Sequence, residues 1–167
     1  MRLFYIVLLI ISIACQAKEN NLDAKLSDSP KVKAQTSLNI ASQDKLLDDC
    51  SEEICLQLIN YDKKKSTFDI WMSNSVPVAG FQCDFHNIKI NEALGGLLED
   101  NGFDASNSDH RVLAFSMQAK TIPAGSGILT TISFSDSQNS ICMTDIIFAG
   151  IGGVKKTTNI PDCINIE

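Results

Sequence analysis

The sequence contains few aromatic residues and no cluster of basic ones. Among 167 residues there are one tryptophan and two tyrosines, and Tyr5 lies in the N-terminal apolar run. A flat platform for crystalline polysaccharide usually needs a row of planar aromatic side chains, so this composition argues against such a surface. The net charge of −6 and the scattered lysines and arginines argue against nucleic-acid binding, because phosphates must be neutralised by clustered cations.

The chain also lacks the motifs of common catalytic sites. It has no G-x-S-x-G nucleophile elbow, no H-E-x-x-H pair and no phosphate-binding P-loop. Its adjacent carboxylates at 48–49 and 99–100 fall in segments predicted as tether or loop, where such pairs are usually solvated charge. We therefore expect a protein that is not an enzyme and that uses no cofactor.

Residues that commonly bind metals do not show ligand spacing. His86 and His110 are the only histidines, and neither is spaced from a cysteine as in a zinc site. The stretch DNGFDASNSD carries oxygen ligands of the kind that calcium prefers, which makes a calcium loop the alternative. Counted from Asp104, however, position six is Asp109 rather than glycine, and no glutamate closes the loop. The sequence predicts no metal site.

The first residues, MRLFYIVLLIISIAC, have the pattern of an export signal. One arginine precedes an apolar run over 3–11, which is too short for a spanning helix of about 20 residues. The stretch SIAC resembles a bacterial lipobox in which Cys15 is acylated, with Ser12 where leucine is usual. The alternative is simple cleavage after Ala17. In both cases we expect 1–17 to be a signal peptide and the protein to be exported to the cell envelope or beyond, with membrane attachment only through the lipid.

Residues 18–48 are predicted to form a flexible tether. The segment is rich in Lys, Asn, Asp, Ser and Gln and has no aromatic residue. Such a composition buries too little apolar surface to offset the entropy lost on ordering. The tether would hold a folded domain, residues 49–167, away from its anchor.

The cysteine pattern indicates disulfides in an oxidising compartment. Six cysteines are present, and both interpretations of Cys15 leave five for the domain. Cys50 and Cys55 form a C-x4-C pair that suits a local disulfide in an exported protein. Cys142 and Cys163 are candidates for a second bridge, although cysteine spacing by itself does not determine connectivity.

The sequence pattern of the domain predicts a series of short strands. Apolar and polar residues alternate in segments separated by runs of Gly, Asn, Asp and Ser, which is typical of an antiparallel two-sheet sandwich. In the segment 78–85 this alternation places Phe81, Cys83 and Phe85 on the core face. The stretch NEALGGLLEDNG, 91–102, is the only helix-like piece, and its two glycines weaken it. The alternating segments are 67–74, 78–85, 110–117, 127–134 and 140–150.

The motifs VPVAGFQCDF, VLAFSM, TIPAGSGILTTISF and ICMTDIIFAG occur in the order seen in cohesin-like domains, which the chain resembles over roughly residues 50–165. This family is related to carbohydrate-binding modules of cellulose-degrading systems. The resemblance implies an all-β jelly-roll sandwich of about nine strands. It further implies a non-catalytic module whose partner is a dockerin-like protein or a polysaccharide.

The same resemblance suggests binding residues on one strand. In cohesins, the strand that resembles FQCDF presents outward polar residues to the dockerin, and alternation places Gln82 and Asp84 at those positions. The chain departs from the family where many cohesins continue with Tyr-Asp-Pro, since it reads Phe85-His86-Asn87. The alternative for Gln82 and Asp84 is an ordinary solvated strand face.

Trp71 is a separate candidate for ligand binding. If Phe68, Ile70 and Met72 face the core, Trp71 faces outward, where an indole can stack on a sugar ring or anchor a protein interface. The alternative is that a loop or the N-terminal tether covers it.

The sequence leaves two functions open. The first is a carbohydrate-binding or protein-interaction module linked to polysaccharide handling at the cell surface. The alternative is a surface adhesion or structural protein-interaction lipoprotein without a glycan ligand.

Overall fold

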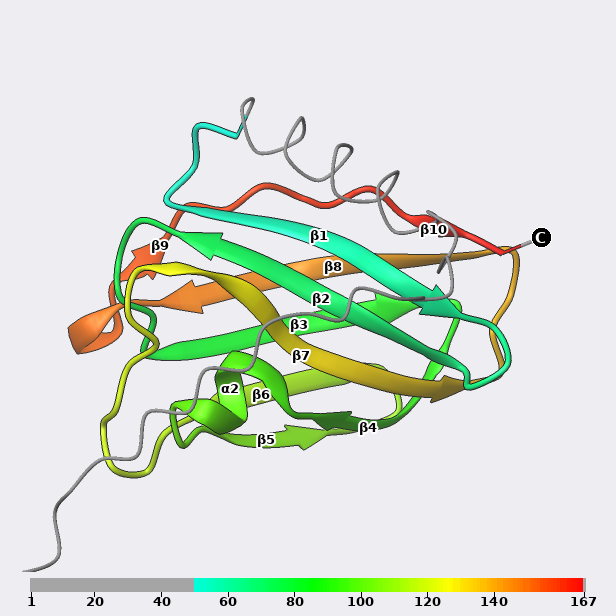
Figure 1. Cartoon of the computed structure of the whole chain (residues 1–167), viewed down its shortest axis with the longest axis horizontal. Helices are drawn as coiled ribbons and strands as arrows, with labels where there is room; N and C mark the ends of the chain where they lie inside the picture. Colours follow the sequence, from blue (N-terminus) through cyan, green and yellow to red (C-terminus); the bar gives the residue numbers. More distant parts are fainter. Residues whose placement is uncertain (1–49, 167) are drawn as a thin grey trace, which may run out of the picture. The chain divides into compact units, whose positions relative to one another are not determined.

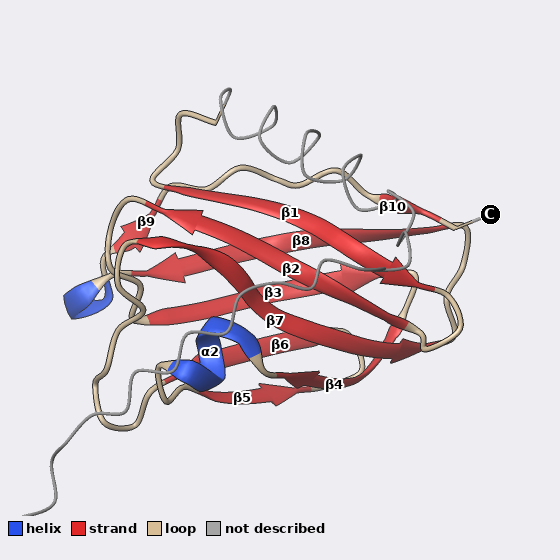
Figure 2. Cartoon of the chain, viewed as in Figure 1, coloured by secondary structure: helices blue, strands red, loops and turns tan. Residues whose placement is uncertain are grey.

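A computed structural model describes residues 50–166 of the chain. The predicted signal peptide, the tether and Cys15 lie outside the described residues. The described part is almost entirely β-structure (Figure 2), and none of its helices is long and apolar enough to cross a membrane. Its ten strands are β1 Ile54–Asp62, β2 Thr67–Asn74, β3 Gly80–His86, β4 Lys89–Leu94, β5 Asp104–Asn107, β6 Arg111–Phe115, β7 Gly125–Ser135, β8 Ser140–Ala149, β9 Lys155–Lys156 and β10 Ile164–Asn165.

The strands form two antiparallel sheets that face each other across one core (Figure 1). One sheet has the order β1-β2-β7-β4, and the other has the order β10-β8-β3-β6-β5, with β9 paired to β8. Strands that are adjacent in the sequence often lie in different sheets, so most contacts join distant segments. This arrangement confirms the predicted all-β sandwich.

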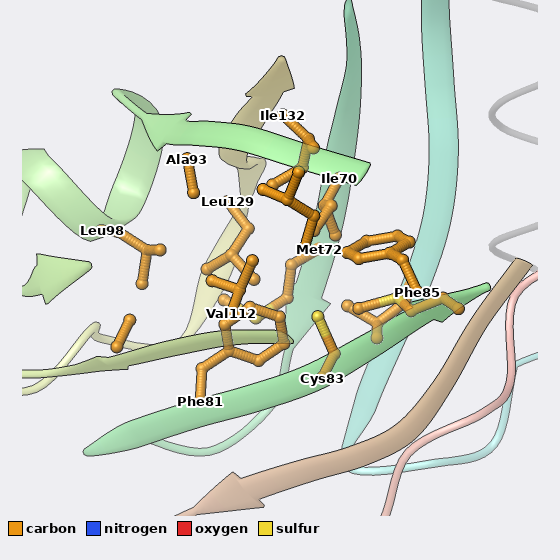
Figure 3. Packing of buried hydrophobic residues seen from close by; sticks show 14 of the residues in the cluster. Ile70, Met72, Phe81, Cys83, Phe85, Ala93, Leu98, Val112, Leu129 and Ile132 are labelled. Atoms are coloured by element: carbon orange, nitrogen blue, oxygen red, sulfur yellow. The ribbon is translucent and has the colours of Figure 1, made fainter. Parts of the chain in front are cut away.

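The core is built from alternate residues of strands in both sheets (Figure 3). On β2, Phe68, Ile70 and Met72 are completely buried, as the sequence predicts. Phe68 makes an edge-to-face contact with Phe85 of the opposite sheet, with ring centroids 5.4 Å apart. Aromatic pairs in this geometry contribute about 0.5–1.5 kcal/mol beyond the burial of their area.

The strand β3 has the predicted orientation. Phe81, Cys83 and Phe85 are buried, whereas Gln82 and Asp84 point to the other side. Cys83 is the only cysteine of residues 50–166 that is outside a disulfide, and burial raises the pKa of its thiol far above the usual range. Cys83 therefore behaves as a small apolar core residue.

The segment 91–102 is not one helix. Its first residues belong to β4, and the short helix α2, Gly96–Asp100, begins at a sharp backbone turn formed by Gly95 and Gly96. Both glycines have positive φ, at 71° and 67°. A Cβ on Gly96 would also collide with the carbonyl oxygen of Ile128. The glycines thus allow a sharp turn from strand to helix against β7.

Both candidate disulfides are present. Cys50 is bonded to Cys55 with a Cα–Cα distance of 6.2 Å, and Cys142 is bonded to Cys163 with a Cα–Cα distance of 4.5 Å. The second bridge attaches the C-terminal segment to the start of β8, where Ile164 also pairs with Ile141. The bridges therefore hold the two ends of the described chain on the sandwich.

Glu53 adds a polar clamp between these ends. Its carboxylate accepts hydrogen bonds from Lys156 Nζ and from the backbone N–H of Thr157, each at 3.0 Å. The Thr157 hydroxyl in turn accepts from the Glu53 backbone N–H at 3.1 Å. These hydrogen bonds, together with the lysine charge, lower the pKa of Glu53.

Candidate functional site

Gln82 and Asp84 lie on the outward side of β3, in the middle of the sheet β10-β8-β3-β6-β5. Their neighbours on β3 are buried, so alternation alone explains why both point away from the core. Both are half-buried, because side chains from β6 and β8 flank them. The two residues therefore belong to a continuous sheet surface.

That surface carries an exposed apolar group. Gln82 lies between Leu113 of β6 and Ile147 of β8, and Phe115 lies in the next row, opposite Gly80. Leu113, Phe115 and Ile147 are 41%, 42% and 42% exposed. Because Gly80 has no side chain, it leaves Phe115 without a neighbouring side chain from β3. We call the surface formed by Gln82, Asp84, Leu113, Phe115 and Ile147 the β3 face.

A β-bulge in β8 places Ile147 on this surface. Gln82 is opposite Ile147, whereas Asp84 is opposite Thr144, so β8 has one extra residue between these pairs. Asp145 in the bulge has φ 46° and is exposed. Without the extra residue, strict alternation would turn Asp145 toward the core and expose Ile146, which packs against it. The bulge therefore keeps a carboxylate in solvent and turns Ile147 outward.

Asp84 and Arg111 form a bidentate ion pair at one end of the β3 face. Arg111 Nε and Nη2 donate to the two carboxylate oxygens at 2.5 and 2.6 Å. The guanidinium lowers the pKa of Asp84, with smaller contributions from His86 and His110, and Asp84 raises the pKa of Arg111. Asp84 is thus occupied by Arg111 and presents its charge to a ligand only together with the guanidinium.

Trp71 lies on the other sheet. On β2 its cross-strand neighbours are Gln57 of β1 and Ile128 of β7. Trp71 is half-buried and points outward, as its buried neighbours on β2 require. The structure therefore places Trp71 and the pair Gln82 and Asp84 on opposite outer surfaces of the sandwich. They cannot contribute to one binding site.

Sequence reasoning missed the apolar residues of the β3 face and the role of Arg111. The signal is present in RVLAF, where apolar residues occupy both alternating positions. Val112 and Ala114 are buried, so Leu113 and Phe115 have to face outward. A strand with apolar residues on both sides in an antiparallel sheet indicates either a covering element or a surface that binds something.

Other parts of the described chain give weaker candidates. A polar hollow at the end of the sandwich where β7 turns into β8 is lined mainly by Asn87, Lys89, Asp109, His110 and Asp136. Between residues 50 and 166 no group of three or more His, Cys, Asp or Glu side chains is arranged to hold a metal ion. The stretch considered as a calcium loop contains β5, which pairs with β6 through backbone hydrogen bonds.

Comparisons with known proteins return only distant structural similarity. No family model matches the chain, and no curated protein matches it. Solved structures align with part of it. A non-cellulosomal cohesin from the hyperthermophilic archaeon Archaeoglobus fulgidus aligns with 14% identity and a TM-score of 0.48, over 71% of this chain and 92% of its own. A chain from the crystal structure of a complex of CaDoc0917 with CaCohA2 aligns with 13% identity and a TM-score of 0.48, over 68% and 99%.

At this level of similarity neither structure identifies which residues of this chain would bind a partner. The candidate site therefore rests on the chain's own exposed side chains.

Proposed function

We propose that this protein is a non-catalytic, exported binding module that docks another protein on its β3 face. The observation that carries the proposal is the group of three large apolar side chains, Leu113, Phe115 and Ile147, that remain more than two-fifths exposed on one sheet surface. Clustered apolar residues next to polar ones are characteristic of protein-interaction surfaces. The ordered motifs that resemble cohesin-like domains also favour a binding module with a dockerin-like partner.

The chemistry of the β3 face suggests what the partner presents. Leu113, Phe115 and Ile147 would pack against apolar side chains, and Phe115 would be the largest anchor. The Arg111 guanidinium uses Nε and Nη2 on Asp84, which leaves Nη1 for a carbonyl or carboxylate of the partner. Gln82, in the middle, offers an amide that can donate and accept.

The proposal is tested by capturing a partner and measuring how single substitutions change its affinity. The exported domain is used as bait with the envelope and secreted fractions of the source organism, and the captured protein is purified. Leu113→Glu should weaken its binding by at least about tenfold, because a carboxylate would be buried unpaired in the interface. Ile128→Glu on the opposite sheet is the matched control, since Ile128 is 38% exposed on a strand.

The two variants give a clear decision. A partner lost with Leu113→Glu and retained with Ile128→Glu supports docking on the β3 face, provided that both variants keep the unfolding temperature of the parent. Retention with Leu113→Glu and loss with Ile128→Glu would contradict it. A glycan array tests the alternative function, which is carbohydrate binding. A glycan that binds the parent and is lost with Trp71→Ala, while Leu113→Glu has no effect, would support a carbohydrate-binding module instead.

A further inference from the structure

The disulfide between Cys50 and Cys55 determines where the preceding chain leaves the sandwich. On β1, Ile54 and Leu56 are buried, so the side chain of Cys55 between them points to the outside of the four-stranded sheet. Cys50 is bonded to it with a Cα–Cα distance of 6.2 Å. Cys50, the first described residue, therefore lies on the outer side of this sheet, beside β1.

Trp71 lies close to this point. Cys55 is opposite Ser73 in the β1–β2 pair, and the next outward pair along the strands is Gln57 with Trp71. Two residues along a strand correspond to about 7 Å. Cys55, to which Cys50 is bonded, thus lies one such step along the sheet from the row that contains the indole.

The sheet around Trp71 presents apolar surface that the β3 face does not use. Ile128, the cross-strand neighbour of Trp71, is 38% exposed, and Leu94 on the edge strand β4 is 55% exposed. The carboxylate of Asp69, on the same side, accepts hydrogen bonds from the Thr131 hydroxyl at 2.6 Å and from the Asn60 side-chain amide at 2.8 Å. We call the surface formed by Gln57, Asp69, Trp71, Leu94 and Ile128 the Trp71 face.

The chain directly before Cys50 carries two leucines that are close enough in the sequence to reach the Trp71 face. Leu46 and Leu47 precede Cys50 by four and three residues. An extended chain spans at most about 3.3–3.6 Å per residue, so these leucines can reach roughly 10–14 Å from Cys50. Trp71 lies in the row next to that of Cys55, to which Cys50 is bonded, so this reach is enough to bring the leucines to the indole. The short connection also gives the leucines an effective concentration at the Trp71 face in the millimolar range.

We propose that the segment directly before Cys50 docks on the Trp71 face, with Leu46 and Leu47 against the indole. The occupant is this segment because the Cys50–Cys55 bridge starts it on this surface, next to an outward tryptophan. The consequence is a defined orientation. This segment would occupy one outer sheet surface, and the β3 face on the other sheet would stay open to a partner.

The test uses the fluorescence of Trp71, the only tryptophan of the chain. In the chain from residue 18 onward, Leu46→Asp combined with Leu47→Asp should shift the emission to longer wavelength. The acrylamide quenching constant should rise at least about twofold, because the covering leucines no longer exclude the quencher from the ring. Replacing Cys50 and Cys55 by serine should change the emission in the same direction, since the segment loses its short connection.

The control variant replaces two other leucines by aspartate, farther from the Cys50–Cys55 bridge. Leu22→Asp combined with Leu26→Asp introduces two carboxylates into the tether far from Leu46 and Leu47 in the sequence and should leave emission and quenching unchanged. The proposal is overturned if the Leu46 and Leu47 double variant matches the parent in both measurements. It is also overturned if the parent's emission changes with protein concentration, because a second copy would then cover Trp71. Neither readout involves the β3 face, so this result and the docking test stand separately.

Discussion

The rings of Phe81 and Phe148 lie opposite each other on β3 and β8, with centroids 4.9 Å apart, and both are buried between the sheets. The outward neighbours of these two residues, Gln82 and Ile147, also lie opposite each other and belong to the β3 face. One pairing register therefore determines both a central part of the core and the middle of the proposed docking surface. A slip of one residue would exchange them.

Truncation on the two sides of β3 should affect stability to very different extents. Phe81→Ala should lower the free energy of unfolding by about 3–5 kcal/mol, because it leaves a cavity beside Phe148. Gln82→Ala should change it by less than about 0.5 kcal/mol, as is usual for outward positions. Denaturant titration of both variants measures the difference. A neutral Phe81→Ala together with an unfolded Gln82→Ala would show that the register is wrong.

The Cys83 thiol should be unreactive in the folded protein. Burial raises its pKa, and the side chain is completely enclosed, so thiolate is neither formed nor accessible. In the chain from residue 18 onward, a thiol reagent should modify no cysteine under native conditions and one in denaturant without reductant. Rapid native labelling that Cys83→Ala abolishes would mean that β3 exposes this residue.

The clamp at Glu53 should make stability depend on pH in the acid range. Its pKa is lowered in the folded state from an ordinary value of 4.5. The stabilisation is therefore present above that value and is lost as the pH falls through the lower folded-state pKa. Glu53→Gln should flatten the loss of stability on acidification. Glu52→Gln is the control, and equal acid curves for Glu53→Gln and the parent protein would contradict the role of the clamp.

The glycines between β4 and α2 separate two causes of strain. Gly95→Ala should cost about 1–3 kcal/mol, since φ 71° and ψ −166° place Gly95 in a backbone region that is essentially restricted to glycine. No atom lies within 4 Å of the new Cβ, so no collision adds to this cost. Gly96→Ala should cost more, because its Cβ would also collide with the backbone of β7. Gly125→Ala has open space and serves as the control. Thermal unfolding that ranks Gly95→Ala below Gly96→Ala in stability would contradict the close approach at Gly96.

The predictable part of the structure is the part that depends on local alternation. The sandwich, the inward side of β2 and β3 and the outward direction of Trp71 follow from period-two patterns, because successive side chains on a strand point to opposite sides. The C-x4-C spacing indicated the first disulfide, and the structure confirms both candidate bridges.

Other features depended on which strands became neighbours. The helix-like segment 91–102 is partly β4, since pairing with β7 outweighs its weak helix propensity. The ion pair of Asp84 with Arg111 joins residues 27 positions apart, and the bulge at Asp145 decides which of Ile146 and Ile147 faces solvent. Alternation by itself determined that Gln82 and Trp71 point outward. Only strand order placed them on opposite sheets, because the sheet to which a strand belongs depends on long-range backbone pairing, which its own residues do not encode.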